Sequence, residues 1–554
     1  MKASDLFVAQ LEEEGIEYIF GLPGEENLDF LESLRTSRIK LIVTRHEQAA
    51  AFMAATYGRL IGKAGVCFST LGPGATNLVT GVAQAQLIGA PLISISGQKA
   101  LIDNWQGRFQ LVDVVRMMEP LCKKAVSITD PGMIPTVIRN AFKHAEAERP
   151  GAVHIELPED VAEDETDAVV QKRSEIRNPS PDPEAVNEAA TMIREAKNPL
   201  IIVSSGANRK EITEELEYFT GKTGIYLVHT QMGKGVVPDD CIYSLFATGI
   251  HARDYVNCGI DGADLIITVG YNIVEYPPYL WNKRLDKKII NIDFVESEPD
   301  RYFNPTIEVI GDIASSIRAL AAGIKDKREF PFFENIRLFI EEKINAAPKE
   351  KYPPLPQSVV HSVRKALGRD DIITLDNGIY KLWFSRLYKT YAPNTILLDN
   401  ALASMGGGLP AGIAAKLLYP ERHVLAICGD GGFMMNCQEL ETAIRYGIPI
   451  VVLILNDNAF GFIKWEQKAL HFKDFGLDFG NPDFSLFAES FGAVGIKVKE
   501  GDNLAEIVES AFALNAVVVI ECPIDYSVNY ETFSIELKEI SCNIMEKNLE
   551  KIEN

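Results

Sequence analysis

Two aspartates follow two apolar runs in the C-terminal third of the chain, and their spacing could bring both carboxylates to one metal ion. Asp430 stands in a glycine turn (Gly429, Gly431, Gly432) after the run VLAIC, and Asp457 directly follows IPIVVLILN. A strand, a turn, a helix and a second strand form one βαβ unit, and ligands bind beyond the carboxyl ends of its strands. Mg²⁺ takes carboxylate and phosphate oxygens, and glycines let a diphosphate approach backbone N–H groups. The pattern predicts a magnesium–diphosphate site; the alternative is an ordinary βαβ unit with two solvent-facing acids.

A glutamate near the N-terminus stands at a second position suited to acid–base chemistry. Glu47 lies where the predicted strand LIVT (41–44) gives way to a helix of small residues, AAAFMAATYG (49–58). Burial in a low-dielectric cleft raises the pKa of a carboxyl group, which suits proton transfer. The alternative reading is a carboxylate that only complements the positive end of the helix.

Three loop segments between predicted strands and helices could also contribute to a site. Residues 21–31 read GLPGEENLDFL, residues 69–85 read STLGPGATNLVTGVAQA, and residues 400–417 read NALASMGGGLPAGIAAKL. Glycines permit tight turns and close approach of a ligand to the backbone. As alternatives, the first two segments are plain connections and Met405 is a core residue.

The elements that must position these residues alternate between strand and helix along the whole chain. Apolar runs such as PLISIS and KKIINIDF are separated by helical patterns, which is typical of parallel sheets covered by helices on both faces. Polar, proline-containing stretches divide the chain into three blocks. We predict an α/β fold with three doubly wound parallel-sheet domains at 1–165, 185–330 and 355–540.

The composition is that of an acidic globular protein of 554 residues with a net charge of −22. Such a charge repels nucleic acid and anionic membranes, so we expect neither as a partner. No apolar stretch reaches the roughly 18 residues that span a bilayer, and the N-terminus lacks a signal-peptide core. These features predict a cytoplasmic protein. The cysteines include no CxxC pair, and we interpret all of them as reduced core residues: Cys67, Cys122, Cys241, Cys258, Cys428, Cys437, Cys522 and Cys542.

The segment 423–462 resembles the thiamine diphosphate signature, in which GDG is followed at a fixed distance by two asparagines. The resemblance implies that thiamine diphosphate and Mg²⁺ are cofactors. It further implies that Asp430 and Asp457 are side-chain ligands of the ion and that the Ala459 carbonyl is the third protein ligand. Asp457 replaces the second asparagine, as it does in the FAD-independent, catabolic acetolactate synthases. The added negative charge must be offset by the cation.

The resemblance, to the acetolactate synthase-like group, covers residues 1–540 and implies roles for other residues. Glu47 matches the glutamate that activates the aminopyrimidine ring of the cofactor. Phe109 and Gln110 match an active-site pair. The remaining cofactor contacts implied are Pro23, Gly24 and Asn77 from the neighbouring subunit, Ala403 through its carbonyl, Met405 beneath the bent cofactor, and Tyr380, Gly429, Gly431, Gly432 and Phe462.

The implied reaction is decarboxylation of a 2-oxo acid, with chemistry supplied by the cofactor. The first hypothesis is an acetolactate synthase that joins two pyruvates into 2-acetolactate with loss of CO₂. The alternatives are a 2-oxo acid decarboxylase that releases an aldehyde, and a cofactor-binding homologue without catalysis. Phe462 replaces a usual methionine, Trp465 is displaced by one position, and Tyr380 lies in IYKLWF where QHQMW is usual. These changes indicate a reshaped acceptor pocket, unless Phe462 and Trp465 are plain packing residues.

Two further expectations concern FAD and assembly. The middle block resembles a domain that holds FAD in some relatives, with GANRK (206–210) and HTQMGKGVVP (229–238) where FAD would pass. It has no distinctive dinucleotide fingerprint, so FAD is a possible cofactor that the sequence does not indicate. The group builds each site from two subunits, which implies a homodimer or a homotetramer with its active sites at the subunit interface.

Overall fold

Three parallel β-sheets organise the chain. A computed structural model describes residues 1–554 except 104–108, 175–176, 251–252 and 543–554. Within the described residues each sheet has six strands, and every strand pair is parallel. The predicted α/β fold with three doubly wound sheets is therefore confirmed. The predicted boundaries at 165, 185, 330 and 355 fall between the sheets and remain predictions.

The strands of each sheet follow one another in the sequence. The first sheet contains β1 (Tyr18–Gly21), β2 (Lys40–Val43), β3 (Gly65–Ser69), β4 (Leu92–Gln98), β5 (Lys124–Ser127) and β6 (Ala152–Pro158). The second contains β7 (Pro199–Val203), β8 (Tyr226–His229), β9 (Ser244–Ala247), β10 (Leu265–Val269), β11 (Lys288–Asp293) and β12 (Ile307–Ile310). The third contains β13 (Ile372–Leu375), β14 (Ile396–Leu397), β15 (Val424–Gly429), β16 (Val451–Asn456), β17 (Val494–Lys497) and β18 (Val518–Pro523). Central strands such as β3, β7 and β10 are buried along their whole length because helices cover both faces.

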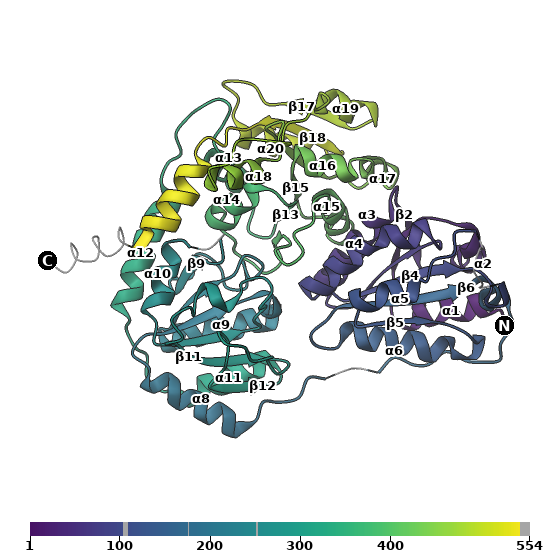
Figure 1. Ribbon diagram of the computed structural model, residues 1–554, viewed down its shortest axis with the longest axis horizontal. Helices are drawn as coiled ribbons and strands as arrows, with labels where there is room; N and C mark the ends of the chain where they lie inside the picture. The colour runs from purple at the N-terminus through teal and green to yellow at the C-terminus, as the bar shows by residue number, and fades with distance from the viewer. Residues whose placement is uncertain (104–108, 175–176, 251–252, 543–554) are drawn as a thin grey trace.

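The helices connect these strands and cover the sheets (Figure 1). In the first unit they are α1 (Ala3–Glu13), α2 (Leu28–Arg35), α3 (Glu47–Ile61), α4 (Pro73–Ile88), α5 (Val114–Met118), α6 (Ile134–Glu146) and α7 (Glu159–Glu163). In the second they are α8 (Pro183–Glu195), α9 (Lys210–Thr223), α10 (Tyr255–Gly262), α11 (Ile313–Gly323) and α12 (Pro331–Asn345). In the third they are α13 (Pro356–Ala366), α14 (Ile379–Leu387), α15 (Gly408–Leu418), α16 (Asp430–Asn436), α17 (Glu439–Arg445), α18 (Gly461–Ala469), α19 (Phe484–Ser490), α20 (Leu504–Ala513) and a closing π-helix (Tyr530–Ile540). Short 3-10 turns complete the connections.

The third unit packs on both of the others. One apolar cluster runs from the second unit into the third, and another joins α3 and α4 of the first unit to α15 and β15 of the third. The small residues of α3 and α4 permit close packing of the two helices, since a Cβ on Gly81 of α4 would lie 2.4 Å from the Cβ of Ala51. These shared cores hold the loops at the strand ends in fixed relative positions.

The helix after the glycine turn differs from the prediction. The sequence predicts a turn at 429–432 and a single helix over 436–447, whereas α16 begins at Asp430 itself and ends at Asn436. A second helix, α17, starts at Glu439 after a short break. Glycines 431 and 432 are thus the first turn of a helix, where backbone N–H groups lack intrahelical partners.

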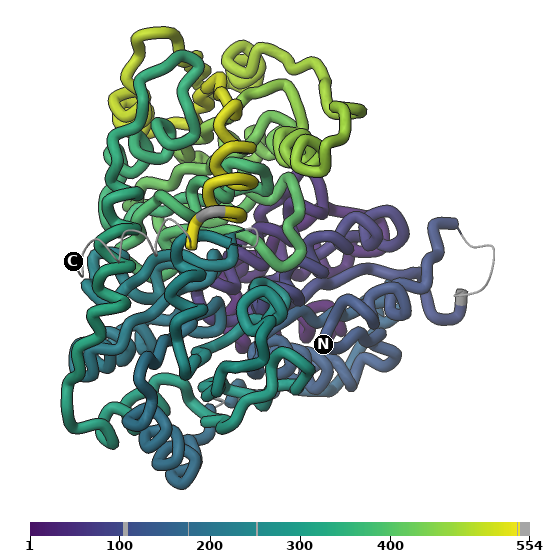
Figure 2. Tube along the Cα trace, turned by 60° about the vertical axis from the view of Figure 1, so that its left-hand side comes forward, coloured from purple at the N-terminus to yellow at the C-terminus, as the bar shows by residue number. Residues whose placement is uncertain are grey.

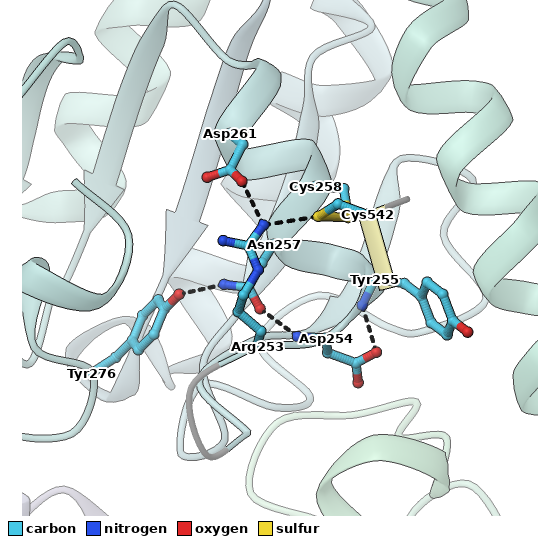
Figure 3. Close-up of a disulfide and its surroundings, with 8 residues drawn as sticks. All are labelled: Arg253, Asp254, Tyr255, Asn257, Cys258, Asp261, Tyr276 and Cys542. Carbon is cyan, nitrogen blue, oxygen red and sulfur yellow. Dashed lines mark hydrogen bonds and ion pairs between the residues drawn. A yellow bond between two sulfur atoms is a disulfide. The ribbon is translucent and has the colours of Figure 1, made fainter. Parts of the chain in front are cut away.

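The interpretation of all cysteines as reduced is wrong for two of them. Cys258 of α10 and Cys542, just beyond the closing helix, form a disulfide, although they are 284 residues apart in the sequence (Figure 3). Figures 1 and 2 show the closing helix (yellow) descending from the third unit toward the second. This covalent contact depends on tertiary structure, and no local sequence spacing signals it. The core reading fits Cys67, Cys428 and Cys522, which are buried and free.

No helix in the described ranges is both long and apolar enough to cross a membrane.

Candidate active site

A pocket lies at the carboxyl ends of β13, β15 and β16, at the sheet edge where ligands bind in open parallel sheets. The segments that line it are far apart in the sequence and meet because their strands are neighbours in the third sheet. The predicted residues in its lining are Tyr380, Met405, Gly429, Asp430, Gly431, Gly432, Asp457, Ala459 and Phe462.

Asp430 is held in one orientation by hydrogen bonds from three segments. Its Oδ1 accepts from the Gly431 N–H at 2.8 Å, and its Oδ2 accepts from the Asn458 N–H at 2.8 Å and from Asn481 Nδ2 at 2.7 Å. Asn481 was not predicted; its side chain also donates to the side-chain oxygen of Asn456 at 3.1 Å. The carboxylate is therefore fixed between the two strand ends.

The second carboxylate, Asp457, lies close enough to Asp430 for their charges to interact. Burial, and secondly the Asp430 charge, raise the pKa of Asp457 to about 7, while burial raises the pKa of Asp430 as well. A buried carboxylate that disfavours the ionised form of a partly exposed neighbour is the arrangement that a shared divalent cation would stabilise. The donor set, two carboxylates beside a loop of main-chain carbonyls, fits a hard cation such as Mg²⁺.

The loop after β16 contains the main-chain carbonyl predicted as the third ligand, that of Ala459, which accepts from the Gly461 N–H at 2.9 Å. Asn458 has a left-handed backbone with φ of +53°, and Ala459 beyond it is buried in the pocket wall. Among the described residues, no three His, Cys, Asp or Glu side chains gather as a metal site. A metal site here would thus rely on Asp430, Asp457 and a main-chain oxygen.

Gly461 has no side chain, and the carboxylate of Asp457 lies where a side chain would be. A Cβ built on Gly461 would lie 2.8 Å from Asp457 Oδ2, which is closer than real contacts allow. Any side chain at this first position of α18 would have to displace the carboxylate. The glycine is therefore a steric requirement of the site.

Two tyrosine hydroxyls in the pocket lack a hydrogen-bond partner among the described residues. Tyr380 and Tyr526 are both in the lining, and their hydroxyl oxygens are buried. Burial raises the pKa of each well above its ordinary value, so both stay protonated donors. Buried polar groups are normally paired, and such orphaned donors fit a ligand with acceptor oxygens, such as a diphosphate. Tyr526 was missed because its segment reads only as the end of a strand.

Phe462 and Trp465 share α18 but differ in surroundings. Phe462 lines the pocket, and its ring meets that of Trp465 edge-on, with centroids 5.4 Å apart. Trp465 is buried, donates from Nε1 to Ser534 Oγ at 3.0 Å, and packs on Phe533 of the closing helix. The packing interpretation therefore describes Trp465, whereas Phe462 faces the site.

Glu47 begins α3, as the sequence predicts, and lies in a separate group of residues in the first unit. Its side chain is buried, and its Oε2 accepts from Asn77 Nδ2 at 3.0 Å. A Cβ on Gly74 would lie 3.3 Å from Glu47 Oε1, so the 69–85 loop also packs against this carboxylate. The side chain of the preceding residue, His46, caps the helix by accepting from the Gln48 N–H.

Other predicted residues of the first unit lie on loops with more exposure. Pro23 is exposed, and Gly24 packs against Thr70, where a Cβ would overlap its side chain. Phe109 is 76% exposed and Gln110 has a left-handed φ of +59°. None of the predicted first-unit residues belongs to the lining of the third-unit pocket. The described chain therefore gathers the predicted site into two groups.

A buried glutamate of the third unit supports the segment that leads into Glu47. Glu439 of α17 is fully buried, accepts from the Arg45 N–H at 3.0 Å and from Thr442 Oγ1 at 2.6 Å. Burial raises its pKa to about 7. Asn436 of α16 adds a second link by donating to Gln48 Oε1 at 3.0 Å. Sequence reasoning missed Glu439 because nothing local shows that this face of α17 meets the first unit.

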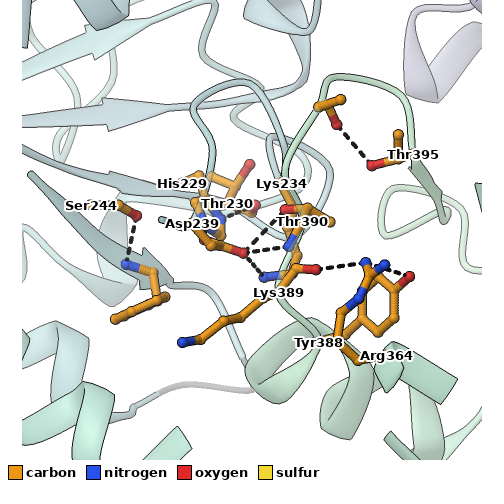
Figure 4. Close-up of polar contacts among 12 residues, drawn as sticks. His229, Thr230, Lys234, Asp239, Ser244, Arg364, Tyr388, Lys389, Thr390 and Thr395 are labelled. Carbon is orange, nitrogen blue, oxygen red and sulfur yellow. Dashed lines mark hydrogen bonds and ion pairs between the residues drawn. The ribbon is translucent and has the colours of Figure 1, made fainter. Parts of the chain in front are cut away.

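The segment 229–238 of the second unit contributes to a buried ionic cluster (Figure 4). Asp239 Oδ1 pairs with His229 Nε2 and Oδ2 accepts from Lys234 Nζ, each at 2.9 Å. Asp239 Oδ2 also accepts from the Thr390 N–H of the third unit at 2.8 Å. These side chains therefore join the second unit to the third. FAD stays a possible cofactor that the sequence does not indicate.

Comparison with known families finds matches in all three units. The N-terminal thiamine pyrophosphate-binding domain of thiamine pyrophosphate enzymes matches residues 1–117, the central domain matches 186–320, and the C-terminal thiamine pyrophosphate-binding domain matches 376–522.

Full-length relatives are also similar. The chain is 32% identical to "Acetolactate synthase" of Bacillus subtilis (strain 168) over 544 residues, 97% of this chain and 95% of that protein. It is 32% identical to "Acetolactate synthase, catabolic" of Raoultella terrigena, with 95% of each chain covered. It is also 32% identical to the "Putative thiamine pyrophosphate-containing protein YdaP" of Bacillus subtilis (strain 168), over 92% of this chain and 89% of that one. With these matches along nearly its whole length, the chain belongs to the thiamine pyrophosphate enzyme family and is an enzyme of its acetolactate synthase-like group.

Proposed function

We propose that this enzyme uses thiamine diphosphate and Mg²⁺ to decarboxylate a 2-oxo acid and to join the product to a second one, with two pyruvates giving 2-acetolactate and CO₂. The carboxylates Asp430 and Asp457, which follow neighbouring strands and line one pocket, are the observation that carries the proposal. The names of the full-length relatives support the carboligation step.

Each residue of the third-unit pocket has a task in this proposal. Asp430, Asp457 and the Ala459 carbonyl would hold Mg²⁺, and oxygens of the diphosphate would complete the coordination of the ion. Tyr380 and Tyr526 would donate to ligand oxygens that reach them. Gly431 and Gly432 would let a diphosphate approach the start of α16, because neither has a side chain there. Met405 and the Ala403 carbonyl would contact the rings. When bound, the cofactor supplies the electron sink for decarboxylation.

Glu47 holds a proton against the aminopyrimidine ring in this proposal. Its burial and its bond from Asn77 keep the carboxyl group in one place. Pro23, Gly24, Phe109 and Gln110 would complete the ring-binding side and the substrate site. Since none of these residues lines the pocket of their own chain, we propose that they serve the pocket of a partner subunit.

The expected assembly is a homodimer or a homotetramer. Several large apolar side chains near the pocket are exposed in the single chain: Met434 (41%), Met435 (47%), Phe460 (37%) and Ile463 (49%). Large apolar side chains that gather beside a pocket and stay exposed in one chain are what a subunit interface would cover. Sedimentation of the active enzyme as a monomer would contradict this assembly.

Two other functions remain in competition. Phe462 stands where the group usually has methionine, and Tyr380 lies in the segment that replaces QHQMW. Both side chains line the pocket, and the reshaped wall would suit a decarboxylase that releases an aldehyde. A non-catalytic homologue would bind the cofactor without turnover. The cytoplasmic location stays a prediction. FAD stays a possible cofactor that the sequence does not indicate, and the visible absorption of the purified protein tests for it.

The product identifies the function. We expect pyruvate, thiamine diphosphate and Mg²⁺ to give 2-acetolactate by NMR, and a chelator to abolish turnover. Aldehyde alone would replace the synthase with the decarboxylase. The Glu47→Gln variant should bind the cofactor as the wild type does and lose most turnover, because an amide cannot hold the ring proton in the same way. Full activity in Glu47→Gln would remove Glu47 from the mechanism.

A further inference from the structure

A lysine buried beside the pocket donates two of its three hydrogen bonds to the loop that carries Met405. Lys381 of α14 is 3% exposed. Its ammonium donates to Asn377 Oδ1 at 2.7 Å, to the Asp399 carbonyl at 3.0 Å and to Asn400 Oδ1 at 3.1 Å. A lysine ammonium has three donors, so this one is fully satisfied without water.

The three acceptors connect two walls of the site. Asn377 lines the candidate cofactor pocket and also a neighbouring cavity between the first and third units. Asp399 and Asn400 begin the loop that leads to Met405. The Lys381 ammonium therefore holds the entry of this loop against the start of α14.

The exit of the same loop is fixed by a second buried group from the same stretch of chain. Asp376 is buried, and its Oδ1 accepts from the Gly406 N–H at 2.9 Å while its Oδ2 accepts from the Gly408 N–H at 3.2 Å. Between the two anchors, Ala403 has a left-handed φ of +56° and Met405 points into the pocket lining. The loop is thus clamped at both ends and strained in the middle.

The charges around Lys381 explain why a cation stands there. Asp399 attracts it most strongly, followed by Glu275 of the second unit and Asp376. Glu275 is fully buried with Arg59 of the first unit as its nearby cation, and the Asn400 side chain donates to the Glu275 carbonyl at 3.4 Å. Burial lowers the pKa of Lys381 to about 8, and these carboxylates work against that shift. All three units thus contribute charge at this point.

We propose that Lys381 is a positioning residue that fixes the 399–408 loop, and with it Met405 and the Ala403 carbonyl, for binding of thiamine diphosphate. The inference rests on the proposed function. It assigns a role to a residue that departs from the QHQMW pattern usual in the group, and it predicts that the cofactor's geometry depends on a side chain that does not touch it.

The test compares Lys381→Met with a matched variant of another buried lysine. Lys416 of α15 is also buried, and its ammonium donates to the Pro420 and Arg422 carbonyls, each at 2.7 Å, outside the pocket lining. Affinity for thiamine diphosphate with Mg²⁺ is measured by tryptophan fluorescence, and the near-ultraviolet circular dichroism of the saturated complexes reports the geometry of the bound rings.

We expect Lys381→Met to lose about tenfold or more in cofactor affinity, as is usual when the supports of a binding group are removed, and to change the dichroism at saturation. Lys416→Met should match the wild type in both. Lys381→Arg should bind the cofactor better than Lys381→Met but less well than the wild type, because the planar guanidinium does not fit three acceptors placed around a compact ammonium. Wild-type affinity and dichroism in Lys381→Met would overturn the inference.

Two further outcomes keep the test decisive. If Lys381→Met does not fold, Asn400→Ala removes one of the three bonds, together with the longer bond to the Glu275 carbonyl, and leaves the charges unchanged. It should lower cofactor affinity by a smaller factor than Lys381→Met. An unchanged Asn400→Ala would then overturn the role. If the wild type itself does not bind thiamine diphosphate, the proposed function fails, and that result is distinct from a normal Lys381→Met.

Discussion

The burial of Glu439 makes a quantitative prediction about stability. Burial raises the pKa of this carboxyl group from 4.5 to about 7, and each unit corresponds to about 1.4 kcal/mol. The ionised side chain therefore costs the folded state up to about 3 kcal/mol relative to the unfolded chain. Glu439→Gln removes this ionisation. The Gln carbonyl can still accept from the Arg45 N–H, and its amide can donate to the Thr442 hydroxyl.

The direction in which stability changes with pH follows from the raised pKa of Glu439. Between about pH 4.5 and pH 7 the folded state keeps the Glu439 proton that the unfolded chain releases, so stability falls as the pH rises through this window. Below the window the penalty is absent, and above it the penalty is complete. The advantage of Glu439→Gln over the wild type should therefore be small near pH 5 and large near pH 8.

Thermal unfolding of the cofactor-free proteins at these two pH values provides the assay. Glu441→Gln is the matched control on the same helix, because Glu441 is one-third exposed and pairs with Arg445. We expect its difference from the wild type to vary little with pH. Parallel pH profiles for Glu439→Gln and the wild type would refute the reasoning and show that the Glu439 carboxylate is well solvated or paired.

Three further substitutions test other parts of the structure. Gly461→Ala should weaken Mg²⁺-dependent cofactor binding about tenfold or more by displacing Asp457, while Gly480→Ala, where a Cβ would meet no atom within 4 Å, should bind normally in the same titration. Lys234→Met removes the ammonium group that pairs with the buried Asp239 carboxylate (Figure 4) and should lower the free energy of unfolding in denaturant by about 3–5 kcal/mol. A change near zero would mean that water enters the cluster. Cys542→Ser should raise hydrogen exchange in the closing helix, and the reduced wild type should behave in the same way; equal protection in all forms would show that packing alone holds the helix.

The parts of the site that the sequence predicts are those positioned by local rules. Strand ends of a parallel sheet lie at one edge, so Asp430 and Asp457 meet once their strands are neighbours. A carboxylate after a predicted strand and before an alanine-rich stretch begins a helix, as Glu47 does. In both cases a few adjacent residues determine the geometry.

The parts that the sequence does not predict depend on contacts between distant segments. Tyr526, Asn481 and Glu439 acquire their surroundings from other strands and from the first unit. The disulfide joins residues 284 positions apart, and no spacing rule reaches that far. Lys381 is unusual for its position, yet only the arrangement of Asn377, Asp399 and Asn400 around its ammonium indicates a role.

The bond between Cys258 and Cys542 closes a covalent loop of chain that contains the whole third unit. Every strand of the third sheet, and the pocket at its edge, lies between these two positions in the chain. The unfolded chain with the disulfide has fewer conformations than the reduced unfolded chain, so the oxidised protein loses less conformational entropy when this unit folds. The oxidation state of Cys258 and Cys542 can thereby set how stable the folded third unit is.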